Sequence, residues 1–343
     1  MMSPAPGTAD SASLALPVLD SALEARLRSR MAVVEAELED AIHSEAPFVT
    51  AAARHLMHAG GKRFRPLLVL LAAEAGDADD ADNLARVVTS ACVVELTHLA
   101  SLYHDDVMDE AVMRRGAESA NARWDNHVAI LAGDFLFSKS SELTARLGAD
   151  AVRIQAETFT ALVEGQILET LGPGDGEDEL AHYLRVVAGK TGSLIATSAR
   201  YGARFAGAPV EVEEALTAYG EKVGSAFQLS DDILDVGSDS DESGKTPGTD
   251  LREGVPTLPT LLAQRSTDPA DARLLELLEA DLTDDGLHAE TLDLLRKHPA
   301  MDEARAYVLE RTSEARQLLD VLPDGPVRDA LDAFAVLIAT RTA

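Results

Sequence analysis

Two clusters of aspartates with the same spacing are the residues in this chain best suited to chemistry. Each has the pattern D-D-x-x-D, and the members are Asp105, Asp106 and Asp109, then Asp231, Asp232 and Asp235. In an α-helix the outer carboxylates of a cluster lie about 40° apart on one face, where they repel each other unless a cation binds between them. Hard oxygen ligands without a cysteine partner favour Mg²⁺, which also binds substrate phosphates. The pattern therefore indicates a magnesium site.

A solvated acidic surface is the alternative for either cluster alone, because the chain holds 59 acidic residues. Both clusters, however, lie within apolar runs of helical spacing, where uncompensated carboxylates are costly to place. Two long helices of an antiparallel bundle can present such clusters to each other across a cavity. Several Mg²⁺ ions between them would clamp a diphosphate that neither cluster could approach alone.

Three cations within four residues form a candidate phosphate-binding segment. Lys62, Arg63 and Arg65 follow Gly60-Gly61 at the start of a helix, although a helix N-terminus normally favours acidic residues. Phosphate explains cations there, and the glycines let the backbone approach an anion closely. The spacing of glycine and lysine is not that of a P-loop.

Further polar residues are weaker candidates when each is taken alone. Arg114 and Arg115 follow the first aspartate helix, where they could pair with phosphate or act only as partners of a helix C-terminus. His98 precedes Asp105 by two helical turns and so points the same way. The remaining candidates are Gln228 near the second cluster, Lys190 and Thr191 at a break in a helix, and Lys245 in a polar loop over 237–255.

The composition excludes several classes of function. The chain has 30 basic and 59 acidic residues, a formal net charge of −29, which argues against nucleic acid and anionic membranes as partners. The single cysteine, Cys92, lies in an apolar helical run, so we expect a buried thiol and no disulfide framework. We find no signal peptide and no apolar run of about 18 residues. The expectation is a soluble, cytoplasmic protein without a transmembrane segment.

The pattern of apolar residues predicts one all-α domain over 19–343, preceded by a disordered leader over 1–18. Aromatic residues are only 4% of the chain, and alternating β-branched runs are scarce. We find no β-hairpin signal. Helices are expected over about 23–42, 47–58, 64–75, 82–108, 121–147, 150–171, 177–206 with a kink at 189–192, and 209–236, followed by three or four shorter ones over 256–341.

Assembled, these residues resemble the trans-isoprenyl diphosphate synthases, or polyprenyl synthetases. The resemblance covers about 55–340, in order and at the family's spacing. Its motifs are G-G-K-R-x-R-P at 60–66, H-x-x-x-x-x-H-D-D-x-x-D at 98–109, M-R-R-G at 113–116, G-D-F-L at 133–136, K-T at 190–191, F-Q-L-S-D-D-I-L-D at 227–235 and G-K-T-P-G-T-D-L-R-E-G at 244–254. It implies a bundle of long antiparallel helices around a deep central cavity, usually in a homodimer.

The resemblance also implies the role of each site residue. Isopentenyl diphosphate would be bound by Lys62, Arg65, His98 and Arg115. The allylic diphosphate, such as farnesyl diphosphate, would be bound by Arg114, Lys190, Thr191, Gln228 and Lys245. The main Mg²⁺ ligands would be Asp105, Asp109 and Asp231, and ligands or holders of metal-bound water would be Asp106, Asp232 and Asp235. One departure is Val255, where many relatives carry a lysine.

The implied reaction is trans-prenyl transfer, in which an allylic diphosphate ionises and isopentenyl diphosphate attacks the cation. Ala100 and Ser101, one turn before Asp105, are small and would leave room for a long product. We therefore expect a heptaprenyl to nonaprenyl diphosphate, with geranylgeranyl diphosphate as the alternative. A terpene cyclase is a weaker alternative because it would lack the pocket of Lys62, Arg65 and His98. A regulatory subunit of a heteromeric synthase would lack one or both aspartate clusters.

Overall fold

The structure is a computed structural model that describes residues 19–237 and 247–340. It confirms the predicted all-α class, while the expected leader over 1–18 and Lys245 lie outside the described residues. The first half contains α1 (Ser21–Ala41), α2 (Pro47–His58), α3 (Phe64–Ala73), α4 (Ala81–Met108), α5 (Ala120–Arg123), α6 (Asn126–Leu147) and α7 (Ala149–Leu171). The second half contains α8 (Glu179–Val187), the π-helix η1 (Ala188–Gly192), α9 (Ser193–Phe205), α10 (Val210–Gly237), α12 (Thr249–Glu253), α13 (Leu258–Ala263), α14 (Ala272–Leu278), α15 (Asp285–Lys297), α16 (Ala300–Leu318) and α17 (Pro326–Thr340), with short 3-10 turns at Pro269–Asp271 and Leu319–Val321.

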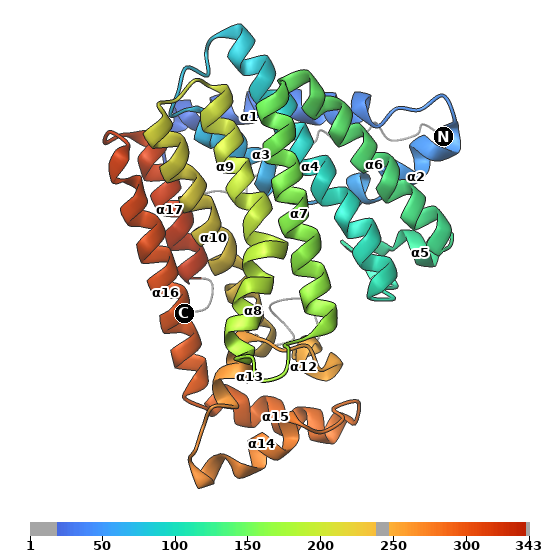
Figure 1. Ribbon diagram of the computed structural model, residues 1–343, viewed down its shortest axis with the longest axis vertical. Coiled ribbons are helices and arrows are strands. Elements are labelled where there is room, and N and C mark those ends of the chain that lie inside the picture. The colour runs from blue at the N-terminus through green and yellow to red at the C-terminus, as the bar shows by residue number, and fades with distance from the viewer. Residues whose placement is uncertain (1–18, 238–246, 341–343) are drawn as a thin grey trace, which may run out of the picture.

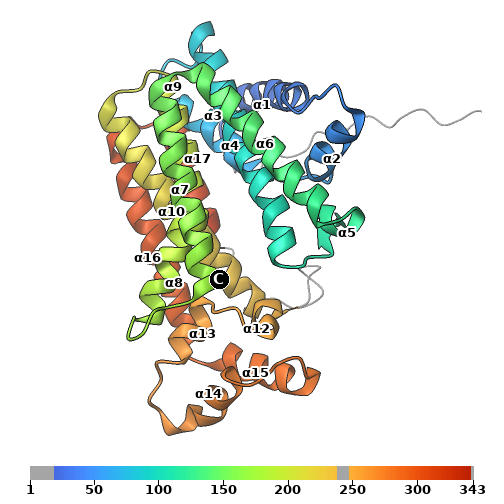
Figure 2. The ribbon, with the colours of Figure 1, turned by 45° about the vertical axis from the view of Figure 1, so that its right-hand side comes forward.

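Long helices running side by side form the body of the molecule (Figures 1 and 2). Helix α4 packs mainly against α6, and α10 packs against α9 on one side and α16 on the other. Helix α3 is buried along nearly its whole length and lies against α9. Gly202 permits this contact, because a Cβ there would lie 2.1 Å from the carbonyl oxygen of Val69. The α14–α15 pair lies at the opposite end of the molecule from α1 (Figure 1).

Helix α4 carries the first aspartate cluster and is also a core helix. By length and composition alone it could cross a membrane, and it is the one helix among those described for which this is true. The expectation that the chain has no apolar run of this length was therefore wrong. Because 67% of its most apolar window is buried inside the fold, its hydropathy is explained by packing against α3, α6 and α9. Cys92, on this helix, is buried as expected.

A short β-hairpin follows α4, and the expectation of no hairpin was wrong. Strand β1 (Met113–Arg114) pairs antiparallel with β2 (Ala117–Glu118). The two loop residues, Arg115 and Gly116, have φ angles of +55° and +75°, as a two-residue turn of the hairpin type requires. Strands of two residues have no alternating pattern to detect, and arginine is a rare residue at a left-handed position.

The break expected over 189–192 is confirmed, and it is a π-helix, η1, between α8 and α9. Helix α7 approaches this segment so closely that neither contact residue can carry a side chain. A Cβ on Gly165 would lie 2.6 Å from the backbone nitrogen of Lys190, and a Cβ on Gly189 would lie 2.8 Å from the carbonyl oxygen of Ala161. The close contact with α7 therefore fixes the position of Lys190.

Candidate active site

The first aspartate cluster lies at the C-terminal end of α4, where its carboxylates point in two directions. Asp105 and Asp109 share a face of the helix, and the side chain of Asp109 is more than half exposed. Asp106 is fully buried, and its Oδ1 accepts a hydrogen bond of 2.6 Å from Nε of Arg114 on the hairpin. Its Oδ2 has no partner among the described residues. Asp106 therefore ties α4 to the hairpin, while Asp105 and Asp109 are the carboxylates that can take an external ligand.

Asp105 is held in an environment that disfavours its negative charge. Burial raises the pKa of Asp105 to about 6, and the negative charge of Asp109 acts in the same direction, while Lys190 and Arg114 oppose the shift. Burial also raises the pKa of Asp106 against the effect of Arg114. A divalent cation near Asp105 would relieve this unfavourable charge, so the residues present fit Mg²⁺.

The second cluster, on α10, has the same spacing but is engaged with the protein in a different way. Asp232 is 4% exposed and accepts hydrogen bonds from the Tyr183 hydroxyl, from Nε2 of Gln228 at 3.3 Å and from the backbone nitrogen of Leu258 at 3.3 Å. Burial raises the pKa of Asp232 to about 7, although these donors lower it. The carboxylate of Asp232 therefore belongs to the packing between α10 and its neighbours.

Asp235 stabilises the start of α12. Its two carboxylate oxygens accept hydrogen bonds from the backbone nitrogens of Thr249 at 3.1 Å and Asp250 at 3.2 Å, and its carbonyl accepts one from Gly248. Asp231 is half-buried on the same helix. No three carboxylate or imidazole groups within 19–237 and 247–340 converge closely enough to hold one metal ion by themselves. Metal binding at these aspartates would therefore also use oxygens of substrate or water.

Three residues predicted to bind isopentenyl diphosphate, Arg65, His98 and Arg115, form one basic cluster. NH2 of Arg115 lies 3.5 Å from Nε2 of His98, and NH1 of Arg115 donates to the carbonyl oxygens of Gly60 at 2.5 Å and Leu56 at 3.2 Å. Burial lowers the pKa of Arg65 to about 10, with Arg115 acting in the same direction and Glu95 opposing it.

The charges in this basic cluster are incompletely compensated, which suits it to an anion. Nε of Arg65 is buried and has no partner in the part of the chain that the structure describes. Burial holds the pKa of His98 well below its usual value, and the positive charges of Arg65 and Arg115 lower it further. His98 is therefore a neutral hydrogen-bonding imidazole at pH 7 in this state. A diphosphate would supply the negative charge that the two arginines lack.

Arg63 has a different role from its neighbours in the basic segment. It donates from Nε to Glu35 at 2.6 Å and from NH1 to the buried Glu95 at 3.0 Å. Its charge is therefore paired within the protein, whereas the side chain of Lys62 is exposed. The residues around Arg63 position the segment, and spacing alone could not distinguish it from Arg65.

Three of the five residues expected around the allylic diphosphate lie where η1 meets α7 and α10, namely Lys190, Thr191 and Gln228. Arg114 lies on the hairpin after α4. Nζ of Lys190 pairs with Glu169 at 2.5 Å, and the positive charge of Lys190 also lowers the pKa of Asp105. The hydroxyl of Thr191 donates to Oε1 of Gln228 at 3.2 Å. Glu169 and Tyr183 are site residues that sequence reasoning missed, because no motif spacing links them to the aspartates.

The two residues expected to control product length lie on different sides of α4. Ser101 is half-buried and about 40° from Asp105 around the helix, and its hydroxyl donates to the carbonyl of His98 at 2.9 Å. Ala100 is fully buried and about 140° from Asp105. Here α4 and α6 pack closely, since a Cβ on Gly133 would lie 3.2 Å from the carbonyl oxygen of Ala100.

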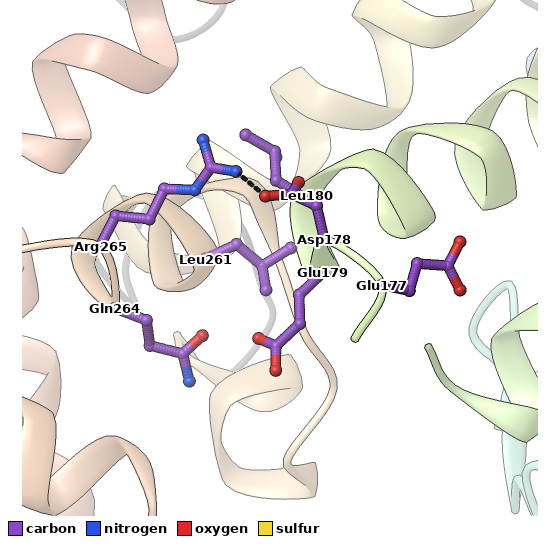
Figure 3. A pocket seen from close by; sticks show the side chains of 7 residues that line it. All are labelled: Glu177, Asp178, Glu179, Leu180, Leu261, Gln264 and Arg265. Carbon is purple, nitrogen blue, oxygen red and sulfur yellow. Dashed lines mark hydrogen bonds and ion pairs between the residues drawn. The ribbon is translucent and has the colours of Figure 1, made fainter. Parts of the chain in front are cut away.

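A separate cleft of about 240 Å³ lies between the start of α8 and the end of α13 (Figure 3). Its lining is Glu177, Asp178, Glu179, Leu180, Leu261, Gln264 and Arg265. Arg265 is paired with Asp178, so the cleft presents mainly negative charge. It does not suit a diphosphate, and the aspartates of α4 and α10 together with the basic cluster remain the candidate active site.

Known proteins resemble this chain over most of its length. The model of the polyprenyl synthetase family matches residues 46–295. A nonaprenyl diphosphate synthase of Mycobacterium tuberculosis is 48% identical, covering 94% of this chain and 95% of that protein.

Two solved structures are also similar. One is a geranylgeranyl pyrophosphate synthase from Corynebacterium glutamicum complexed with calcium and isoprenyl diphosphate, with a TM-score of 0.85 and 44% identity over 95% of this chain and 99% of that one. The other is a decaprenyl diphosphate synthase from Rhodobacter capsulatus, with a TM-score of 0.83 and 35% identity over 94% of this chain and 99% of that one. The chain therefore belongs to the polyprenyl synthetase family of prenyltransferases.

Proposed function

We propose that this chain condenses isopentenyl diphosphate with an allylic diphosphate, in a Mg²⁺-dependent reaction, to make an all-trans polyprenyl diphosphate of heptaprenyl to nonaprenyl length. The observation that carries the proposal is the hairpin after α4. Its adjacent residues Arg114 and Arg115 contact Asp106 and His98, respectively. The hairpin therefore joins the aspartate cluster to the basic cluster, so two diphosphates could bind side by side.

Each substrate would have its own set of residues. Lys62, Arg65, His98 and Arg115 would hold isopentenyl diphosphate and orient its double bond. Arg114, Lys190, Thr191, Gln228 and Lys245 would hold the allylic diphosphate, whose leaving group gains negative charge as the carbon–oxygen bond breaks. Such positioning turns an encounter of two substrates into a reaction within one complex.

Asp105, Asp109 and Asp231 would hold Mg²⁺, which supplies charge stabilisation for the departing diphosphate. Asp106 and Asp232 would support these ligands from buried positions, and Asp235 would do so from a half-buried one. The elimination of a proton after carbon–carbon bond formation would use a diphosphate oxygen as the base. Apolar neighbours of the aspartates on α4 and α10 would limit the access of water to the cation.

The proposed product length is supported by the 48% identity to a nonaprenyl diphosphate synthase and by the small residue at Ser101. Geranylgeranyl diphosphate is the second candidate, because a synthase of that product is 44% identical with a TM-score of 0.85.

We further propose a cytoplasmic homodimer without a transmembrane segment. Support for the dimer comes from an exposed apolar stripe on α7, formed by Val152, Phe159, Val163 and Ile167. These side chains recur at helical spacing on one face, and a second copy would cover them.

Incubation with farnesyl and isopentenyl diphosphates and Mg²⁺, followed by mass analysis of the products, tests the function. We expect products from C35 to C45, no elongation with excess EDTA, and loss of elongation in Asp105→Ala and Asp231→Ala. Products that end at C20 would favour the geranylgeranyl alternative. A complete lack of elongation by the folded, Mg²⁺-loaded protein would contradict the synthase proposal.

A further inference from the structure

A ring of hydrogen bonds closes across the π-helix η1 and includes a tyrosine that the proposed mechanism leaves without a role. Tyr183 on α8 donates its hydroxyl to Oδ2 of Asp232. Gln228 donates from Nε2 to Oδ1 of the same aspartate at 3.3 Å, and Thr191 donates to Oε1 of Gln228 at 3.2 Å. The backbone segment from Tyr183 through η1 to Thr191 completes the ring. Its polar links fix both the orientation of the Gln228 amide and the rotation of the kinked helix.

The π-helix itself brings the two ends of this ring onto one face. In a regular α-helix, the eight steps from Tyr183 to Thr191 would leave their side chains about 80° apart around the axis. A π-helical turn takes in about one residue more than an α-helical turn. That extra residue absorbs about 100° of rotation, which leaves Tyr183 and Thr191 within about 20° of each other and both facing α10. The π-helical turn therefore places Tyr183 and Thr191 where both can join the hydrogen-bonded ring.

Asp232 is the junction of the ring, and it acts as an acceptor within the protein. Both of its oxygens accept hydrogen bonds, and the backbone nitrogen of Leu258 on α13 supplies a third donor at 3.3 Å. A carboxylate that is 4% exposed would be costly to bury without such donors. Its contacts instead join α8, α10 and α13 at the level of the second aspartate cluster.

We propose that Tyr183 is a positioning residue for the allylic diphosphate. Its hydroxyl holds Asp232, Asp232 orients Gln228, and Gln228 holds Thr191 beside Lys190. This inference rests on the proposed role of Lys190, Thr191 and Gln228 as the allylic diphosphate site. A tyrosine that only packed α8 against α10 would affect stability without changing affinity for one substrate.

The test compares Tyr183→Phe with Tyr201→Phe. Tyr201 is a matched control, because it is a buried tyrosine on α9, beyond the same kink, whose hydroxyl donates to the carbonyl of Ala151 at 2.9 Å. The probe is farnesyl S-thiolodiphosphate, an unreactive allylic analogue, titrated calorimetrically in the presence of Mg²⁺. We expect Tyr183→Phe to weaken its binding about tenfold, as the loss of a hydrogen bond to a charged group would. Tyr201→Phe should bind it as the wild type does.

Kinetics provide a second readout of the same variants. In Tyr183→Phe the KM for the allylic substrate should rise by the same factor as the dissociation constant, while the KM for isopentenyl diphosphate stays unchanged. Equal affinities of Tyr183→Phe and Tyr201→Phe for the analogue would overturn the inference. If the wild type itself neither binds the analogue nor elongates a substrate, the proposed function fails instead, so the two failures are distinguishable.

Asp232→Asn shows whether Tyr183 acts through Asp232, and it covers the case in which Tyr183→Phe does not fold. The double variant Tyr183→Phe with Asp232→Asn removes the buried charge together with its donor, which is less costly than removing the donor alone. We expect this double variant to bind the analogue as weakly as Asp232→Asn does. A further tenfold loss in the double variant would show independent action and overturn the inference.

Discussion

Nε of Arg114 lies 2.6 Å from the buried Oδ1 of Asp106, so the hairpin and the end of α4 are joined by an ion pair that is closed to solvent on the aspartate side. The guanidinium itself is about one-third exposed and can also face a substrate. Asp106 thus stabilises the fold, whereas Asp105 and Asp109 of the same motif are the proposed metal ligands.

This pair predicts a loss of stability in Arg114→Ala. Removing the arginine leaves a buried carboxylate without its side-chain donor, which costs about 2 kcal/mol of unfolding free energy. Urea denaturation measures the change. The double variant with Asp106→Asn should recover part of the loss, because the charge is removed with its partner. An equal or greater loss in the double variant would contradict this explanation.

Arg65 should behave in the opposite way, since its burial is unfavourable in the absence of a ligand. Burial and Arg115 lower its pKa to about 10, and its buried Nε has no partner among the described residues. Arg65→Met should therefore raise the KM for isopentenyl diphosphate by about 10- to 100-fold, the effect of losing one charge-assisted hydrogen bond. The melting temperature should be unchanged or higher. An unchanged KM with a large loss of stability would assign Arg65 to the structure.

Asp232 should make the metal-free protein less stable as pH rises. Burial raises its pKa from 3.8 to about 7, so between about pH 4 and pH 7 the native state keeps a proton that the unfolded chain has lost. The native state binds more protons in this window, and the free energy of unfolding therefore falls as pH increases. Above about pH 7 both states are ionised and the destabilisation is complete.

Urea denaturation at pH 5 and pH 8 in EDTA measures this effect in the wild type and in Asp232→Asn. The variant lacks the titrating group, so its stability should fall less between the two pH values. Equal falls in the two proteins would show that Asp232 ionises with an ordinary pKa.

The two small residues before Asp105 should respond differently to a large substitution. Ser101→Phe places a ring on the side of α4 that carries Asp105, and we expect shorter products in the mass analysis. Ala100→Phe places a ring in the packed contact between α4 and α6, and overpacking of this kind costs about 1–3 kcal/mol. Its main effect should be a lower melting temperature. A Ser101→Phe enzyme with the wild-type product distribution would contradict the proposed path of the growing chain.

The sequence predicted the helices well, because each long helix repeats its apolar residues over many turns, as α4 and α10 do. The hairpin escaped detection because its strands have two residues each, too few for a period. Arg63 and Arg65 could not be told apart either. Their difference arises from Glu35 and Glu95, which the fold brings to Arg63 from distant parts of the chain.

The second aspartate cluster shows most clearly what spacing cannot reveal. Asp232 and Asp235 have the positions of Asp106 and Asp109 in the pattern, yet their partners differ completely. Tyr183 and the amides at the start of α12 reach them only because α8 and α12 pack against α10. A periodic pattern determines the face on which a side chain lies, whereas its bonding is decided by whatever packs against that face.

The ion pair of Lys190 and Glu169 has a consequence for turnover. With Nζ of Lys190 2.5 Å from a carboxylate, a diphosphate that binds the lysine competes with Glu169, so part of its binding free energy offsets the weakening of that ion pair. After the reaction the ion pair of Lys190 and Glu169 can form again, which favours release of the inorganic pyrophosphate by-product. Glu169→Gln should therefore bind pyrophosphate more tightly than the wild type and be more strongly inhibited by it. A single acidic side chain on α7 thus favours the release of one product at the expense of tighter substrate binding.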